Sequence, residues 1–392
     1  MSLPERYLTL AFRVGKHEPE LVENYYGPPE LLAAVEAEEP LEPARLAEEA
    51  QALLADLQGG DLEPERRAWL AGQTRALETI ARRLEGDPLT YGEEVEATFG
   101  IRPRWYDERD FERAHDLLDE ALPGSGDVRA RYARWFEQTV IPLEKLLPAL
   151  ESVTEELRAR SGAVVGLPEG ETIELELVSG KHWSGFNRNL GELRSRISIN
   201  TDLPFQAGDL AYFVAHEAYP GHHVDGAWKE QVLVRERGQL EETLTLYAAP
   251  ECVLAEGIAE LAVGVVTDDG GQELNARTLG SLGIDFDPEL GGQVFAARRL
   301  LRAVTSNLVL LRYERGASLD DLRDYVRRWT LQPEARIEKM VASVTARPFA
   351  GYVHCYPEGL RLCAAYVRGD PKRFKRLLVE QLLPSDLSSA AA

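Results

Sequence analysis

Apolar residues recur at three- and four-residue spacing along much of the N-terminal part of the chain, with Glu and Arg between them. Such spacing places the apolar side chains on one face of a helix. It predicts helices over residues 31–57, 64–84, 107–122 and 127–160. Proline lacks the backbone N–H that a helix interior requires, so Pro40 and Pro43 should divide the first of these helices. Pro142 and Pro148 should likewise kink or divide the last one.

The pattern changes after Pro168. Residues 172–178 and the second half of 194–200 alternate apolar and polar side chains, which is typical of strands with one buried face. Turn-forming residues fill 179–185 between them, and we therefore predict a small antiparallel sheet. Helical spacing resumes over residues 207–218, 230–266, 292–315 and 319–329. The predicted fold class is mainly α with a small antiparallel sheet (α+β).

Composition narrows the class of protein. The chain has 392 residues, 44% of them apolar, which is enough for a substantial core. Its 44 Lys and Arg stand against 66 Asp and Glu, and the formal charge of −22 disfavours nucleic acid and anionic membranes as partners. The first residues lack a signal-peptide pattern and no apolar run reaches membrane-spanning length, so we expect a cytoplasmic protein. The cysteines Cys252, Cys355 and Cys363 have no metal-site or disulfide spacing.

A metal-binding pattern lies in the run from His216 to His223, which reads H-E-A-Y-P-G-H-H. Catalytic zinc takes three protein ligands and keeps a fourth position open, and the motif H-E-x-x-H supplies two of them from one helix face. Here Pro220 stands where the second His of that motif would be. We therefore ask which of the later histidines could replace it.

An undistorted helix would separate residues 216 and 222 by about 9 Å along its axis and by about 240° around it, too far apart to share one ion. Pro220 and Gly221 can bend the chain sharply enough to bring His222 back to the metal. We favour His216 and His222 as ligands, and His223 is the alternative to His222.

The third ligand is expected on a later helix. Glu256 and Glu260 lie one helical turn apart in an apolar stretch, where a carboxylate is costly to bury unless it is paired or coordinated. Glu256 is the candidate ligand, and Glu260 is the candidate for orienting a ligand histidine through its second nitrogen. The alternative is that both are ordinary solvated surface residues.

Together these residues resemble a bacterial domain-of-unknown-function family that carries the motif H-E-x-x-P-G-H-H, followed by a helix with Ser or Ala, Glu and Gly. The matching positions here are 216–223 and 255–257, with further likeness at 196–204 and 25–29. That family is similar to the gluzincin zinc metallopeptidases. The resemblance implies a zincin-like fold with a helical cleft around the metal helix. An N-terminal helical part would cover residues 1–165, and a catalytic part residues 166–392.

The resemblance also suggests functions for two further segments. The strand over residues 195–200 would be an edge strand that pairs with an extended substrate, unless it only packs. His354, Tyr352 and Tyr356 would donate hydrogen bonds to the oxyanion formed during hydrolysis, unless they are buried structural residues. His182, in the turn of the sheet, is a weaker candidate for lining the cleft.

The sequence therefore predicts a zinc-dependent hydrolase that cleaves short peptides with zinc-activated water and with Glu217 as the general base. One alternative is a metal-dependent hydrolase of a non-peptide amide or ester, which would need the same activated water. Another is a non-catalytic, metal-containing peptide-binding protein. Glu217 argues against this last alternative, because a structural zinc site needs no base.

Overall fold

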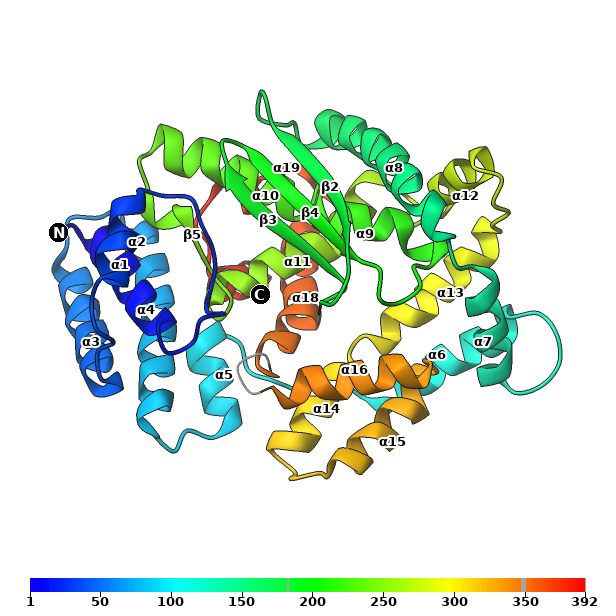
Figure 1. Ribbon diagram of the computed structural model, residues 1–392, viewed down its shortest axis with the longest axis horizontal. Helices are drawn as coiled ribbons and strands as arrows, with labels where there is room; N and C mark the ends of the chain where they lie inside the picture. Colours follow the sequence, from blue (N-terminus) through cyan, green and yellow to red (C-terminus); the bar gives the residue numbers. More distant parts are fainter. Residues whose placement is uncertain (182, 347–349, 392) are drawn as a thin grey trace.

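Figure 1 shows the computed structural model, which describes residues 1–181, 183–346 and 350–391. Helices dominate it, as predicted. The first half of the chain forms helices α1 (Leu3–Gly15), α2 (Pro29–Glu36), α3 (Pro43–Gly59), α4 (Pro64–Glu85), α5 (Tyr91–Phe99), α6 (Glu108–Ala121), α7 (Val128–Gln138) and α8 (Leu143–Val164). Pro43 begins α3 and Pro142 precedes α8, which confirms that prolines divide both of the long predicted helices. Pro148 is accommodated inside α8.

The second half of the chain is also mainly helical. It contains α9 (Leu210–Glu217), α10 (His222–Lys229), α11 (Pro250–Val266), α12 (Gln272–Ser281), α13 (Pro288–Leu301), α14 (Val304–Tyr313), α15 (Leu319–Thr330), α16 (Glu334–Thr345), α18 (Cys355–Val367), α19 (Pro371–Val379) and α20 (Pro384–Ala391). Shorter turns of other helix types are η1 (Ala207–Asp209), the π-helix η2 (Glu230–Glu236), η3 (Leu240–Thr243) and η4 (Tyr352–His354). None of the described helices is long and apolar enough to cross a membrane.

The strands form two small sheets. Strand β1 (Val22–Tyr25) pairs antiparallel with β5 (Leu244–Leu246). The larger sheet has the order β2-β4-β3 and contains β2 (Thr172–Val178), β3 (Gly185–Gly191) and β4 (Arg194–Asn200). Both predicted strands of this sheet are present, but they are parallel to each other. The reason is the additional strand β3, which forms an antiparallel hairpin with β4 and leaves β2 to pair on the other side of β4.

This order corrects the expected role of the strand before the metal helix. β4 is the central strand of the larger sheet, because it pairs with both β2 and β3. Its backbone groups are therefore already bonded on both sides, and β4 cannot pair with a substrate. The edge strands are β2 and β3, and β3 faces the cleft described below.

Helix α11 lies at the centre of the molecule and is buried along most of its length, packed against α9 and α18 (Figure 1). One hydrophobic cluster runs from α1, α3 and α4 through α8, α9 and α11 to α18 and α19. A second cluster joins α6, α7 and α13. Cys252, Cys355 and Cys363 are buried and unpaired, which agrees with the expected absence of a disulfide framework.

Candidate metal centre

The predicted metal motif lies at a break between two helices. Helix α9 ends at Glu217, and α10 begins at His222. Gly221 passes so close to α9 that a Cβ atom there would lie 1.9 Å from the carbonyl oxygen of His216, so only glycine permits this turn. The turn brings the rings of His216 and His222 to a centroid separation of 4.8 Å and an angle of 88°. The helix is thus distorted at Pro220 and Gly221, as predicted.

The third group of the site comes from α11. Glu256 is only 3% exposed, and its position follows from the close packing of α11 against α18. A Cβ atom on Gly257 would lie 2.4 Å from the carbonyl oxygen of Gly359, and one on Gly359 would lie 2.1 Å from that of Val253. Glycine at both positions therefore lets the two helix backbones approach, which places the Glu256 carboxylate beside the histidines.

His216, His222 and Glu256 form a group that could hold a metal ion. Oε2 of Glu256 lies 3.4 Å from Nε2 of His216, and Oε1 lies 3.8 Å from Nε2 of His222. One ligand atom from each of the three side chains lies within 4.8 Å of the others. Within the described part of the chain, this is the one such group of His, Cys, Asp and Glu side chains.

The donor atoms fit a bound ion in spacing and in charge. In a tetrahedral zinc site with bonds of about 2.0–2.1 Å, neighbouring ligand atoms are about 3.3 Å apart, close to the separations found here. Oε2 of Glu256 is buried and has no hydrogen-bond partner among the described residues. A buried carboxylate oxygen without a donor is unfavourable unless a cation meets it. His216, His222 and Glu256 therefore fit a divalent metal ion.

Burial and charge shift the pKa of these groups. Burial lowers the pKa of His216, but the Glu256 carboxylate, 3.4 Å away, outweighs this effect and raises that pKa to about 9. Burial lowers the pKa of His222 to about 4, against the charge of Glu256. The pKa of Glu256 is itself lowered, because the interactions with both histidines outweigh its burial. A proton on His216 thus balances part of the carboxylate charge, and metal binding would displace that proton.

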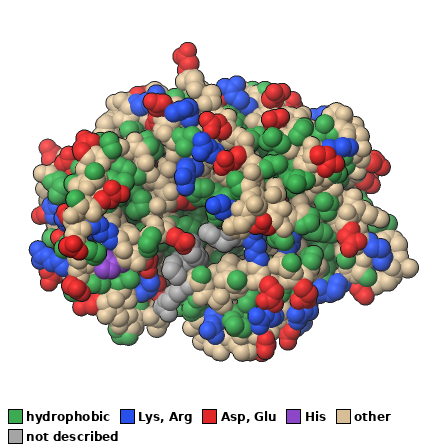
Figure 2. Space-filling view, in the orientation of Figure 1, with side chains coloured by type: hydrophobic (Ala, Val, Ile, Leu, Met, Phe, Trp, Pro, Cys, Tyr) green, Lys and Arg blue, Asp and Glu red, His purple; other side chains and the backbone are tan. Residues whose placement is uncertain are grey.

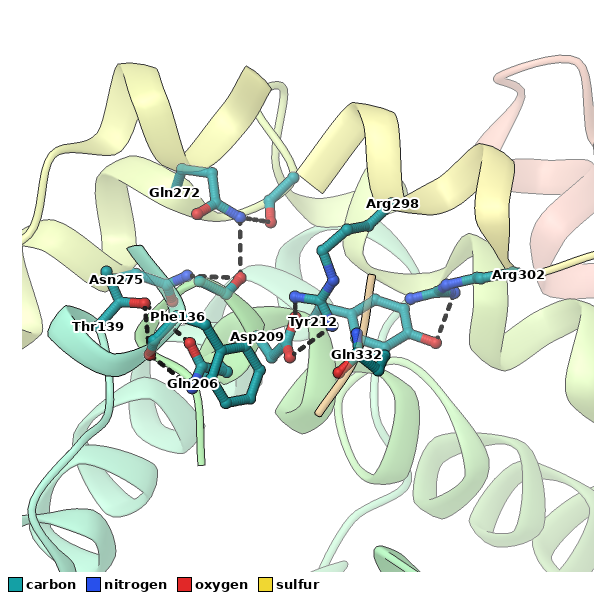
Figure 3. Close-up of polar contacts among 12 residues, drawn as sticks. Phe136, Thr139, Gln206, Asp209, Tyr212, Gln272, Asn275, Arg298, Arg302 and Gln332 are labelled. Carbon is teal, nitrogen blue, oxygen red and sulfur yellow. Dashed lines mark hydrogen bonds and ion pairs between the residues drawn. The ribbon is translucent and has the colours of Figure 1, made fainter. Parts of the chain in front are cut away.

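Tyr212 holds the second nitrogen of the His216 ring. Its hydroxyl lies 3.3 Å from Nδ1 of His216 and donates to Oε1 of Glu260 at 2.6 Å. Arg302 donates to the same hydroxyl at 2.8 Å (Figure 3) and pairs with Glu260. Because the hydroxyl gives its own proton to Glu260, it can accept Nδ1–H of His216, which leaves Nε2 as the ring nitrogen that faces Glu256 and can bind a metal ion. Glu260 therefore acts on His216 through Tyr212, since its own oxygen is 3.9 Å from Nδ1.

Glu217 lies beside this group and lines the same cleft. Its backbone carbonyl accepts a hydrogen bond of 2.7 Å from the side chain of Asn187 on β3, which ties the end of α9 to the sheet. Burial raises the pKa of the Glu217 carboxyl to about 7, with His216 opposing and Glu256 adding to the rise. A carboxyl group with that pKa can both accept and release a proton near neutral pH.

His223 lies on the other side of α10, away from the metal group. Its Nδ1 lies 2.8 Å from the hydroxyl of Ser195, and its Nε2 lies 2.8 Å from Glu171. Tyr219 donates to the same Glu171 carboxylate at 2.7 Å. Successive side chains on a helix point about 100° apart, so the neighbouring histidines face different surroundings. Since both ring nitrogens of His223 are bonded, the structure places His222 rather than His223 as the partner of His216.

The C-terminal cluster is divided between the cleft and the core. Tyr352 and Tyr356 line the cleft. The hydroxyl of Tyr352 donates to Oε1 of Glu256, and its ring stacks on Tyr247 with centroids 4.3 Å apart. The ring of Tyr356 is nearly parallel to that of His216, with centroids 6.4 Å apart. Both tyrosines thus lie beside His216 and Glu256.

His354 lies elsewhere. It is fully buried, and its Nε2 is 2.9 Å from the hydroxyl of Tyr91 on α5. Burial lowers its pKa to about 4. The structure does not bring His354 to the cleft, because it points from η4 toward the N-terminal helices while its neighbours point toward α11. This placement corrects the expectation that its ring reaches a reacting carbonyl. His182 lies outside the described residues.

The metal group lies in the wall of a cleft of about 1230 Å³. Figure 2 shows a hollow near the middle of one face, with acidic and basic side chains at its rim. The cleft is lined by residues of β1, β3, α9, α10, α11, α13 and α16. Segments from both ends of the chain therefore enclose the site.

Two side chains and one strand of this cleft are not among the elements predicted from the sequence. Tyr212 stands four residues before His216 on α9, so its place on the same helix face could have been recognised. Arg302 gave no such signal, because only the packing of the end of α13 against α9 brings it to Glu260. Strand β3 was also missed, since its sequence from Gly185 to Gly191 does not alternate apolar and polar residues.

The chain matches no model of a known protein family and no curated protein. Its fold is similar to that of a candidate lipoprotein from Colwellia psychrerythraea, with a TM-score of 0.55 and 17% identity over 88% of this chain. The match covers 66% of the Colwellia protein, so this chain spans just under two thirds of its length. A candidate lipoprotein of unknown function from Shewanella oneidensis is similar with a TM-score of 0.50 and 11% identity, covering 92% of this chain and 75% of that one.

An M32 carboxypeptidase from Deinococcus radiodurans R1 also aligns, over 99% of this chain and 94% of that enzyme. Its TM-score is 0.40 and the identity is 12%, which is too low to carry an inference about this chain. The similarities to the two lipoproteins concern the fold alone.

Proposed function

We propose that the protein is a zinc-dependent hydrolase that cleaves peptide bonds in short peptides. The observation that carries this proposal is the convergence of His216, His222 and Glu256 beside Glu217 in one large cleft. Two imidazoles and one carboxylate are a common ligand set of catalytic zinc, and they leave a coordination position open. Zinc bound there would polarise water and the substrate carbonyl as a Lewis acid.

Glu217 would accept and then donate the proton that this reaction transfers. As the water oxygen bonds to the carbonyl carbon, the Glu217 carboxylate takes a proton from that water. When the bond between carbon and nitrogen breaks, Glu217 gives the proton to the leaving amine, so the products are a carboxylic acid and an amine. The position of Glu217 supports both steps, because it directly follows His216 on α9 and lines the same cleft.

The tyrosines would have separate functions in this reaction. Tyr352 holds Glu256 through its hydrogen bond and therefore positions a metal ligand. The hydroxyl of Tyr356 forms no hydrogen bond within the part of the chain that the structure describes, and the residue lines the cleft beside His216. Tyr356 is thus the better candidate to donate to the oxyanion that develops on the substrate.

Strand β3 supports a peptide as the substrate. It is an edge strand of its sheet, and residues 185–189 line the cleft next to Glu217. The unpaired edge of a strand can form main-chain hydrogen bonds with an extended peptide, which fixes the substrate without regard to its side chains. The volume of the cleft suits a short chain segment rather than a folded protein.

The variant Glu217→Gln tests this function, because it preserves shape while removing the base. We expect it to bind zinc as the original protein does and to lose about two to four orders of magnitude in kcat on a mixture of short peptides. Glu151→Gln, an exposed substitution on α8, is the matched control and should change neither quantity. Hydrolysis of peptides at the original rate by Glu217→Gln would reject Glu217 as the base. If the zinc-loaded protein cleaves esters but no peptide, the substrate assignment is wrong.

A further inference from the structure

One part of the cleft contains a buried carboxylate oxygen that accepts no hydrogen bond from the described residues. Asp225 lies three residues after His222 on α10, about 4.5 Å farther along the helix axis and near the same face. Asp225 is 5% exposed and lines the cleft. Oδ2 accepts a hydrogen bond of 2.9 Å from Lys229, whereas Oδ1 has no hydrogen-bond partner among the described residues. This buried oxygen is available to a donor on a bound molecule.

The charge around Asp225 favours a cationic donor. Four carboxylates line this part of the cleft: Glu23, Asp225, Glu242 and Glu251. The cations among them are Lys229 and Arg188, so negative groups are in excess. Burial raises the pKa of Glu242 to about 8 and that of Glu251 to about 7, while Lys229 opposes both shifts. A positively charged group that enters would stabilise these carboxylates in their ionised form.

The part of the cleft lined by α13 and α16 has the opposite charge. Arg336 donates to the carbonyl oxygen of Pro204 at 2.9 Å, and Lys339 donates to that of Trp183 at 3.3 Å. Within residues 1–181, 183–346 and 350–391, neither cation forms an ion pair with a carboxylate. Burial and the charge of Arg298 lower the pKa of Arg336, although Asp209 opposes this shift.

Two acids lie near these cations, and both have other partners. Asp202 interacts with Lys339 through its charge but accepts its hydrogen bonds from the backbone N–H groups of Gly180 and Lys181. Asp209 pairs with Arg298 through both carboxylate oxygens, at 2.8 and 3.1 Å, as Figure 3 shows. Arg299 lines the same region. In a chain with a formal charge of −22, this concentration of unpaired cations in a cleft is unusual. It fits an anionic group on a bound molecule, because a carboxylate can accept from Arg336 and Lys339 together.

The two charged regions are lined by different elements, the first by β1, η3, α10 and α11 and the second by α13 and α16. In Figure 1, β5, which pairs with β1, lies on the side of α11 nearer the N-terminal helices, whereas α13 and α16 lie on the other side. We propose that the cleft selects short peptides with both ends unblocked and binds them in one direction. The terminal ammonium group lies at Asp225, and the terminal carboxylate lies at Arg336 and Lys339. This inference rests on the proposed peptidase function and specifies its substrates.

Four forms of one short peptide test the proposal: both ends free, the amino end acetylated, the carboxyl end amidated, and both ends blocked. For the zinc-loaded protein we expect kcat/KM to fall at least about tenfold with each block, because each removes a charged hydrogen-bonding group. Equal kcat/KM for all four peptides would overturn the proposal and leave the peptidase function standing. Binding of the same peptides to Glu217→Gln, measured by calorimetry, gives the ranking even if no peptide is cleaved.

Substitutions at each end assign the direction of binding. Glu251→Gln should reduce the penalty for acetylation and leave the penalty for amidation unchanged, and Lys339→Met should do the reverse. Glu151→Gln and Lys372→Met are the matched controls at exposed positions outside the cleft. Zinc content and Tm of each variant show whether it is folded. If Glu251→Gln instead reduces the penalty for amidation, the proposed direction is wrong.

Discussion

At the scale of single residues, the adjacent histidines His222 and His223 point into different surroundings and are expected to have different functions. His222 faces Glu256, whereas His223 is bonded to Ser195 and Glu171 beneath the sheet. The sequence could name both as candidates but could not choose with certainty, because the direction of each ring depends on how sharply Gly221 turns the chain.

We predict that His222→Ala loses most of the bound zinc and that His223→Ala keeps it. His223→Ala should instead destabilise the fold by about 1–3 kcal/mol, since it leaves Glu171 and Ser195 without a buried partner. Metal analysis of both purified variants and their denaturant unfolding check these outcomes. Greater zinc loss in His223→Ala than in His222→Ala would reverse the ligand assignment.

His354 should affect stability and its dependence on pH. Its pKa of about 4 in the folded protein is below the value of about 6.5 expected in the unfolded chain. The unfolded chain therefore takes up the proton first as pH falls. The stabilisation from neutral His354 is complete above about pH 6.5 and is lost as pH falls toward 4, a change on the order of 3 kcal/mol.

We therefore predict that His354→Ala has a lower Tm at pH 7 but loses less additional stability between pH 6.5 and 4 than the original protein does. Its activity per folded molecule should be unchanged, because His354 does not line the cleft. Denaturant unfolding across this pH range and active-site-normalised kinetics measure the two effects. A large loss of kcat with unchanged stability would contradict this prediction and show that His354 takes part in catalysis.

At the scale of elements, periodicity identified most of the long helices and both alternating strands. It could not show that β2 and β4 would run parallel, because that depends on β3. β3 contains little apolar sequence and becomes a strand through its pairing with β4 and its contact with α9. Local pattern therefore located the sheet, whereas tertiary pairing determined which strand faces the cleft.

The contact between α11 and α18 gives a prediction at the same scale. Gly359→Ala would place a Cβ atom 2.1 Å from the carbonyl oxygen of Val253, so the helices must separate. We expect a loss of about 1–3 kcal/mol in stability, together with weaker zinc binding as Glu256 moves. Gly264→Ala on α11 is the control, because a Cβ there meets nothing within 4 Å and alanine should stabilise the helix slightly. Zinc affinity that is unchanged in a destabilised Gly359→Ala would show that Glu256 does not depend on this contact.

At the scale of the whole molecule, the cleft is assembled from segments that lie far apart in the chain. Glu23 comes from β1, the metal group from α9 to α11, and Arg336 from α16. The sequence signal was strong for the metal group, where the residues are close together, and absent for the charged walls. Residues that lie far apart in the sequence and meet only after folding have no characteristic spacing, so the sequence pattern could not predict that they line one cleft.

Metal binding should therefore stabilise the entire fold, since its ligands join α9, α10 and the central helix α11. Zinc at 1,000 times its dissociation constant would contribute about 4 kcal/mol to the free energy of unfolding. With an unfolding entropy of about 2 cal/mol/K per residue, this corresponds to a Tm about 5 °C higher for 392 residues. We predict that chelation lowers Tm by this amount and that added zinc restores it. His222→Ala should show no response to either treatment, and a chelator effect of equal size in that variant would place the stabilising ion elsewhere.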